Sequence, residues 1–326
     1  MGRFFKVNKF VIKTIVLIMF ICSLRVPIFA SELAQIPYSV GNKYQLEEAM
    51  IIATDRLANE FTVNAAGMTN DDLRSYSIVD NQLLSERLNG YKMVKPRASG
   101  NEVVITLYYK TMYEASMAYK DPNTYERKIS REAREALENA KSVISRKITP
   151  DMNDFTKEKV IHDYIVENTT YTKGSLEGRK ATESIFGVQG VLCNKVAVCQ
   201  GYAETMKLFM DMLGIDCYVV TGTANANKQT VAHAWNLVNL DNEWYHVDTT
   251  WDDTDQENQK VYTYFNLTDD EIMKDHRADS NRRYPEANGK KYAYDAMNIA
   301  CTYEEFSQKI NELLQKGVSE GNCLWQ

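Results

Sequence analysis

The chain has 326 residues, which is enough for one large domain or two moderate ones with buried cores. Its composition is that of an ordinary globular protein, with 44% hydrophobic and 25% charged residues, and no repeat or low-complexity segment stands out. The formal net charge of −6 argues against nucleic acid or an anionic surface as the main partner.

The first thirty residues have the pattern of a secretory signal peptide. Cationic side chains come first, an apolar run follows from Thr14 to Leu24, and the small residue Ala30 precedes Ser31. We therefore expect cleavage after Ala30 and a protein that is secreted or associated with the cell envelope. The apolar run is short for a bilayer span, although an uncleaved N-terminal anchor is the alternative. Cleavage would remove five cationic residues and no acidic one, which takes the formal net charge from −6 to −11.

Residues 31–150 are predicted to form a smaller α+β module. Hydrophobic periodicity and turn residues predict a helix over 46–57, a strand near 61–64, short helices near 71 and 81, a hairpin of 91–95 with 103–109, and a charged helix over 130–148. No catalytic pattern occurs in this module. We expect it to pack on the rest of the chain, with substrate selection as the alternative role.

Residues 151–290 are predicted to form the catalytic part, beginning with a helix over 156–168. Within it, apolar residues recur every three or four positions downstream of Cys199 and end before Gly214, where a left-handed cap would need glycine. Cys199 therefore lies in the first turn of an amphipathic helix. The free backbone N–H groups and the helix dipole favour a thiolate there, and the same N–H groups are suited to an oxyanion.

A hairpin is expected to bring a histidine and a carboxylate together. Strands over 232–240 and 243–250 flank the turn-forming pair Asp241-Asn242. With a two-residue loop, His233 faces Thr250, and His233 and Asp248 become diagonal neighbours on one face. A slip of one residue would separate them. In this arrangement Asp248 orients the imidazole and His233 takes the proton of Cys199.

These motifs resemble those of bacterial transglutaminase-like proteins. The resemblance is carried by CQGYA at Cys199, HAWN at His233 and WYHVDTTWDD at Trp244, and extends over roughly 156–276. It implies an α+β, papain-like core with the cysteine at a helix N-terminus packed on an antiparallel sheet. It also implies Cys199 as nucleophile, His233 as base and Asp248 as the orienting acid. Many relatives have proline where this chain has Thr254, which affects a loop and not the triad.

Several site residues have competing interpretations. Gln189, Asn194 and Trp235 are candidates for substrate contact or for the second oxyanion donor, and the sequence does not choose among them. His246 is a rival base because it shares the strand parity of Asp248. His162, on an apolar helix face, is interpreted as a structural histidine. Trp235 and Trp251 either cover the site or serve as core packing, and the acidic residues 252, 253 and 255 are expected to face solvent.

Cysteine spacing predicts no structural metal, and no cofactor is expected. Five cysteines remain after signal cleavage, so at least one is unpaired in a monomer. Cys193 and Cys217 are interpreted as small buried hydrophobes, whereas Cys301 and Cys323 are candidates for a disulfide. A helix over 266–276 capped by Thr268 and a C-terminal helical extension over 291–326 complete the chain.

The predicted function is thiol-dependent acyl transfer or hydrolysis. The substrate would be a peptide or glutamine amide bond of a protein or of peptidoglycan at the cell envelope, which makes the chain a cysteine peptidase, a transglutaminase or a deamidase. No nucleic acid partner and no stable membrane insertion after cleavage are expected. A binding or scaffolding protein that keeps the fold without turnover is the alternative.

Overall fold

The structure is a computed structural model that describes residues 38–96, 100–172, 183–226, 228–253 and 261–293. The predicted signal peptide, Thr254, Cys301, Cys323 and most of the predicted C-terminal extension lie outside these residues. No helix in the described ranges has both the length and the apolar character needed to cross a bilayer.

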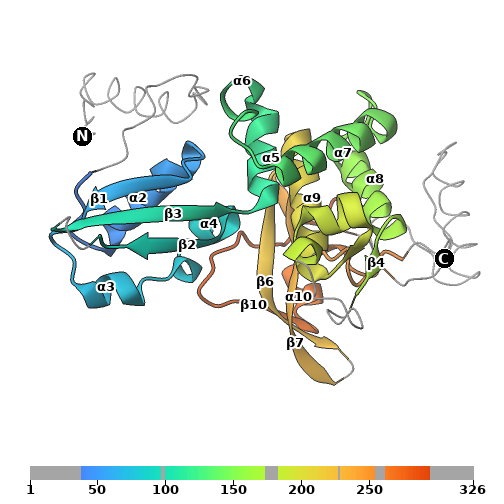
Figure 1. Cartoon of the computed structure of the whole chain (residues 1–326). Coiled ribbons are helices and arrows are strands. Elements are labelled where there is room, and N and C mark those ends of the chain that lie inside the picture. Colours follow the sequence, from blue (N-terminus) through green and yellow to red (C-terminus); the bar gives the residue numbers. More distant parts are fainter. Residues whose placement is uncertain (1–37, 97–99, 173–182, 227, 254–260, 294–326) are drawn as a thin grey trace, which may run out of the picture. The chain divides into compact units, whose positions relative to one another are not determined.

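The N-terminal part has the mixed α and β elements that its sequence predicts. They are α2 (Lys43–Asp55), β1 (Glu60–Asn64), α3 (Asn70–Ser75), η1 (Ile78–Asp80), α4 (Gln82–Arg87), β2 (Leu88–Val94) and β3 (Glu102–Tyr109). The three strands form an antiparallel sheet in the order β1-β3-β2, drawn in blue and teal in Figure 1. The hairpin of β2 and β3 is confirmed, and β1 adds to it on the free edge of β3.

Three helices follow, and all three contribute residues to a core shared with the helix of Cys199. They are α5 (Thr111–Lys120), which sequence periodicity missed, α6 (Pro122–Tyr125) and the charged helix α7 (Arg131–Lys147). Buried Ala115 of α5 and Ala136 of α7 belong to the same cluster as Tyr202 of α9. Helix α8 (Asp154–Glu167), as predicted from 156–168, packs into this core as well. This core contains residues from both sides of residue 150. The domain boundary expected there remains a prediction.

The helix α9 (Cys199–Leu213) begins at the cysteine and ends at Gly214, whose φ of 75° is left-handed as predicted. It follows β4 (Thr170–Tyr171), η2 (Glu183–Phe186), η3 (Gly190–Asn194) and β5 (Val196–Ala197). The glycine of the CQGYA motif has a packing reason. A Cβ on Gly201 would lie 2.7 Å from the carbonyl oxygen of Ile185, so only glycine lets the start of α9 approach η2 this closely.

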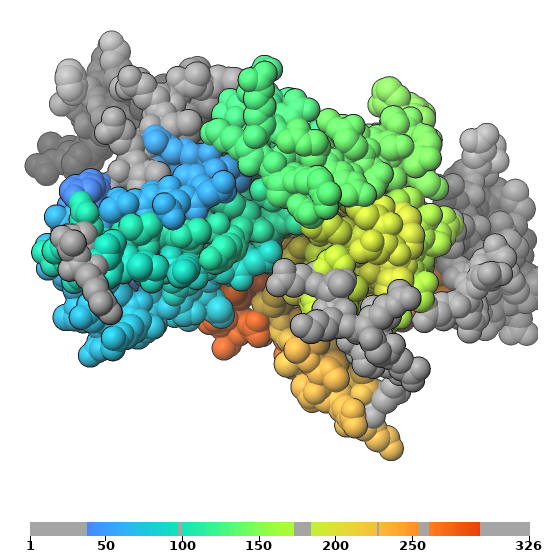
Figure 2. All heavy atoms as spheres, in the orientation of Figure 1, coloured from blue at the N-terminus to red at the C-terminus, as the bar shows by residue number. Residues whose placement is uncertain are grey.

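The second sheet is antiparallel and has the order β10-β6-β7-β8-β9. Its strands are β6 (Cys217–Ala226), β7 (Gln229–Leu240), β8 (Glu243–Val247), β9 (Phe265–Leu267) and β10 (His276–Ala278). Val219 and Ala234 lie against Ala203 of α9, whereas Trp235 and Leu237 pack in a separate cluster with Ile272. Figure 2 shows the far end of β6 and β7, in gold, projecting from the surface. Helices packed on antiparallel sheets make the fold class α+β.

The predicted hairpin register is confirmed. Asp241 and Asn242 both have positive φ, as a two-residue turn of type I′ requires, and Leu237 pairs with His246. The predicted extent of the second strand is wrong, because β8 ends at Val247 and not at Thr250. After Val247 the chain leaves the ladder, and the Asp248 N–H instead donates to the carbonyl oxygen of Tyr264 over 2.8 Å.

The predicted helix over 266–276 is also wrong in its extent. Only α10 (Asp269–Ile272) is helical, and it begins with the predicted Thr268 cap in a capping box with Glu271. Within the predicted range, Asn266 and Leu267 belong to β9, and His276 begins β10. Hydrogen bonding to the two edges of the sheet overrides the local helical pattern.

Candidate active site

Cys199 lies at the N-terminus of α9, next to the sheet. Val198 precedes the helix and has no side chain that can cap it, so N–H groups of the first turn remain available to a ligand. The thiol is free and partly exposed, and it packs against Ala203, Val219 and Ala234. This position combines an accessible sulfur with the positive end of a helix dipole.

His233 forms a hydrogen-bonded pair with Asp248. The distance from His233 Nε2 to Asp248 Oδ2 is 2.7 Å, and both side chains are buried. Burial by itself lowers the pKa of His233, but the charge and hydrogen bond of Asp248, together with the interaction of the imidazolium with an ionised Cys199 sulfur, raise the pKa to about 10. Since Nε2 faces Asp248, Nδ1 is the ring nitrogen left for Cys199. The structure therefore brings together the three residues predicted to form the triad.

Asp248 is held by its backbone neighbours as well as by histidine. Its second oxygen, Oδ1, accepts hydrogen bonds from the N–H groups of Thr250 at 3.0 Å and Trp251 at 3.2 Å. These contacts depend on the turn that replaces the end of the predicted strand. The turn therefore fixes the carboxylate more firmly than a continuing strand would, and it leaves Oδ2 free to face His233.

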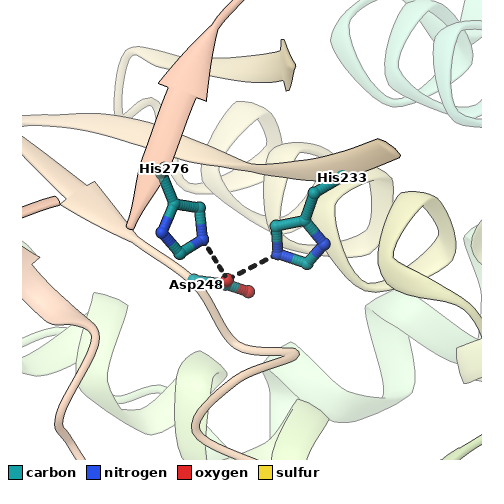
Figure 3. A group of neighbouring side chains, drawn as sticks. All are labelled: His233, Asp248 and His276. Carbon is teal, nitrogen blue, oxygen red and sulfur yellow. Dashed lines mark hydrogen bonds and ion pairs between the residues drawn. The ribbon is translucent and has the colours of Figure 1, made fainter. Parts of the chain in front are cut away.

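A second histidine, His276, contacts the same carboxylate oxygen. His276 Nε2 lies 3.2 Å from Asp248 Oδ2, so the rings of His233 and His276 flank one acceptor (Figure 3). Sequence analysis placed His276 at the end of a helix and gave it no role. Only the pairing of β10 with β6 brings it to the site, and no sequence signal indicated that pairing.

Aromatic rings surround the two histidines. The Trp251 ring centroid lies 5.5 Å from that of His233 and 4.5 Å from that of His276. The Trp235 ring lies 5.0 Å from His276. Tyr171 also approaches the site: burial is the main cause of its raised pKa, and the charges of Cys199 and Asp248 add to it. Both tryptophan rings thus lie against the site histidines, and Trp235 is also buried in the core whereas Trp251 is partly exposed.

The rival base His246 is occupied elsewhere. Its Nδ1 accepts a hydrogen bond from Trp235 Nε1 at 3.0 Å, and its Nε2 lies 2.8 Å from Asp269 Oδ1. Both ring nitrogens are therefore used to attach α10 to the sheet. This geometry favours His233 as the base.

We predict that His246→Gln leaves the alkylation rate of Cys199 within about twofold of wild type, while lowering the melting temperature. The reason is that His246 contacts Trp235 and Asp269 and not the thiol. Iodoacetamide labelling at pH 7 followed by peptide mapping measures the rate. A drop in rate as large as that caused by changing His233 would return His246 to the site.

The three candidate oxyanion or substrate residues use their donor groups in other contacts. Gln189 Nε2 donates to Thr111 Oγ1 at 2.7 Å, Asn194 Nδ2 donates to Ser184 Oγ at 3.1 Å, and Trp235 donates to His246 as described. The structure does not bring these groups to Cys199. The N–H groups at the start of α9 are the remaining oxyanion donors on geometric grounds.

His162 belongs to a buried ionic network beside the site. Its Nε2 lies 3.1 Å from Asp252 Oδ2 and its Nδ1 lies 3.2 Å from Asp163 Oδ1. Burial opposes the charge on the ring, but the two carboxylates raise the pKa of His162 to about 9. The structural interpretation of His162 holds. The expectation that Asp252 faces solvent is wrong, because it is fully buried, and Asp253 accepts a hydrogen bond from Tyr202 at 2.5 Å.

The other two described cysteines differ from Cys199. Cys217 is buried, and burial raises its thiol pKa strongly; burial also raises the pKa of Cys193. Neither has an imidazole partner in the described part of the chain. Cys217 fits the interpretation of a small buried hydrophobic residue, whereas Cys193 is partly exposed and only packs against the core.

One group of described side chains has ligand atoms close enough for a metal ion. These are His233, Asp248 and His276, whose nearest donor atoms all lie within 4.8 Å of one another. The 2.7 Å from His233 Nε2 to Asp248 Oδ2 suits a hydrogen bond, whereas two ligands of a tetrahedral zinc ion lie ~3.3 Å apart. Metal binding would therefore require the pair to open.

Comparison with known families accords with this geometry. Residues 139–249, about a third of the chain, match the family described as the transglutaminase-like superfamily. The match includes Cys199, His233 and Asp248. This segment is therefore similar to transglutaminase-like domains. Its fold is accordingly transglutaminase-like, with the cysteine at a helix start and the histidine on an adjoining strand.

Solved structures resemble this chain only weakly. A crystal structure of a TGase shares 18% identity over 63% of this chain and 54% of its own, with a TM-score of 0.31. A candidate cysteine protease from Cytophaga hutchinsonii shares 17% identity over 49% of this chain and 61% of its own, with a TM-score of 0.30. This chain thus spans less than two thirds of either structure. A search of curated proteins gave no significant match.

Proposed function

We propose that this chain is a thiol-dependent acyl transferase or hydrolase. The observation that carries the proposal is the contact series from Cys199 through His233 to Asp248, with 2.7 Å between His233 Nε2 and Asp248 Oδ2. A free cysteine at a helix start, a histidine within hydrogen-bonding contact of it and a buried orienting carboxylate are the parts that thiol catalysis needs. In these roles Cys199 is the nucleophile, His233 the base and Asp248 the orienting acid.

The reaction proceeds in two balanced steps. The Cys199 thiolate attacks an amide carbonyl carbon, the carbon–nitrogen bond breaks, and the leaving amine or ammonia takes the proton held by His233. Water or a second amine then attacks the thioester carbon while His233 accepts its proton. The carbon–sulfur bond breaks, and the proton returns to the sulfur. Water gives hydrolysis or deamidation, and an amine gives transamidation.

The proposed substrates are peptide bonds or glutamine amides of proteins or peptidoglycan. We further propose that the protein acts outside the cytoplasm, either secreted or associated with the envelope. This rests on the cationic and apolar pattern of residues 1–30. The acidic character of the chain disfavours nucleic acid as a partner.

The first test compares the cysteines within one molecule. At pH 7 with limiting iodoacetamide, Cys199 is expected to be labelled at least roughly 10-fold faster than Cys193 and Cys217, because only Cys199 has an imidazole partner and a helix N-terminus. Peptide mapping by mass spectrometry measures all three rates in one sample. Equal rates would remove the support for catalysis and favour a non-catalytic binding protein.

A second experiment identifies the reaction. The mature protein is incubated with glutamine-containing peptides, with and without a primary amine, beside a Cys199→Ala control. Amine incorporation, deamidation and chain cleavage give products of different mass. Any of these products, if absent in the control, supports the proposal, and no product from a varied peptide and peptidoglycan-fragment set would oppose it.

A further inference from the structure

The proposed mechanism of Cys199, His233 and Asp248 gives His276 no role, although His276 lies within hydrogen-bonding distance of Asp248. The His276 side chain is fully buried, and its Nε2 lies 3.2 Å from Asp248 Oδ2, the oxygen that His233 Nε2 contacts at 2.7 Å. Figure 3 shows the two rings on either side of this oxygen. A buried polar ring in such a position requires a physical reason.

The hydrogen-bonded series continues beyond His276 toward the surface. His276 Nδ1 lies 2.5 Å from Asp275 Oδ1, and Tyr264 donates its hydroxyl hydrogen to Asp275 Oδ2 at 2.7 Å. Ionised carboxylates only accept hydrogen bonds, so the contact with Asp248 requires His276 to carry an N–H on Nε2. The hydrogen-bonded series therefore runs from Asp275 through His276 to Asp248 and His233.

The backbone holds His276 in this place. His276 begins β10 and pairs with Ala224 of β6. Two positions along, a Cβ on Gly222 would lie 2.1 Å from the carbonyl oxygen of Arg277, so β10 can lie against β6 only because residue 222 is glycine. The Trp251 and Trp235 rings then enclose the imidazole on two sides.

We infer that His276 is a positioning residue that holds Asp248 oriented toward His233 and in its ionised form. This rests on the proposed function, since it assigns a role within the same site. The match to the transglutaminase-like family covers residues 139–249, which contain Cys199, His233 and Asp248. His276 lies outside this range, so the match does not include it.

Electrostatics support the same role. Burial by itself raises the pKa of Asp248, but the charges and hydrogen bonds of His233 and His276 more than reverse this, so the pKa lies well below its usual range. The other titratable groups affected by the charge of Asp248 are Tyr171, Asp252 and Tyr264. Of the titratable side chains that these contacts place around Asp248, His233 and His276 stabilise its charge, and the N–H groups of Thr250 and Trp251 do so at Oδ1.

The test uses two variants of His276 and the labelling rate of Cys199. His276→Phe keeps a ring between the tryptophans but has no donor, and we expect a rate about 10-fold lower, the kinetic equivalent of one hydrogen bond to a charged group. His276→Gln keeps an N–H near Asp248 and should recover most of the rate. The acid limb of the rate profile should move to higher pH in His276→Phe, because Asp248 loses a hydrogen bond that stabilises its ionised form, the partner of the His233 imidazolium.

Controls separate this role from a structural one and from the proposed function. Asp270→Asn, an exposed change on the same segment, should keep the wild-type rate and pH profile. If His276→Phe does not fold, Asp275→Ala at the outer end of the series should shift the acid limb in the same direction by a smaller amount. The inference would be overturned if His276→Phe kept the wild-type rate and pH profile, or if His276→Gln reacted no faster than His276→Phe. If His276→Phe does not fold, a wild-type rate and pH profile in Asp275→Ala would overturn it. If Cys199 of the wild-type protein were labelled no faster than Cys193, the proposed function would be overturned, and the role of His276 with it.

Discussion

Replacing His233 with alanine should lower the rate of thioester formation about 10²-fold to 10⁴-fold at neutral pH, the usual contribution of a positioned general base. In the wild type, the attraction of Asp248 makes His233 a strong acceptor for the Cys199 proton. Without the imidazole, no side-chain base is in place to accept the proton of the attacking thiol, and only the helix N-terminus still favours an anion there. The rate of Cys199 alkylation, and kcat/KM once a substrate peptide is found, measure the loss.

The matched control is His246→Gln, which removes another buried histidine of the same sheet without touching the thiol. Asp248→Asn should reduce the rate in the same direction as His233→Ala, because the amide cannot stabilise an imidazolium as a carboxylate does. An unchanged rate in folded His233→Ala would show that another group takes the proton.

Replacing His162 with leucine should destabilise the fold by ~3–5 kcal/mol, because it leaves the fully buried Asp252 without its charged partner. Urea unfolding at pH 7.5 measures this free energy. Adding Asp252→Asn to His162→Leu should recover roughly 1–2 kcal/mol, since asparagine is uncharged and can still accept the Tyr264 N–H now bound by Asp252 Oδ1 at 2.9 Å. A double variant no more stable than His162→Leu would contradict the buried-charge explanation.

The same network predicts a pH dependence. His162 has a folded-state pKa of about 9, above its unfolded value of about 6.5. Its contribution to stability is therefore complete below pH 6.5 and is lost as the pH rises through 9. His162→Leu should lack this part of the decline. Asp154→Asn, which breaks the surface pair of Asp154 with Lys157, should cost under about 1 kcal/mol and serves as the control.

Local sequence determined the elements that carry the proposed triad. The apolar period after Cys199 and the glycine at 214 set the start and end of α9, because helix periodicity and capping act within a few residues. Asp241 and Asn242 set the register of the hairpin, because a two-residue turn admits one pairing. Strand register predicted that His233 and Asp248 are neighbours, and the resemblance to transglutaminase-like proteins added Cys199 to the same site.

Tertiary structure decided what surrounds that triad. His276 reaches Asp248 only because β10 adds to the edge of the sheet, and edge pairing between segments about 50 residues apart leaves no periodic signal in the sequence. Asp252 likewise looks like one member of an exposed acidic cluster until His162 of α8 buries it. The second histidine and the buried network depend on contacts between distant segments, and these are fixed by packing and by charge pairing in a low-dielectric interior.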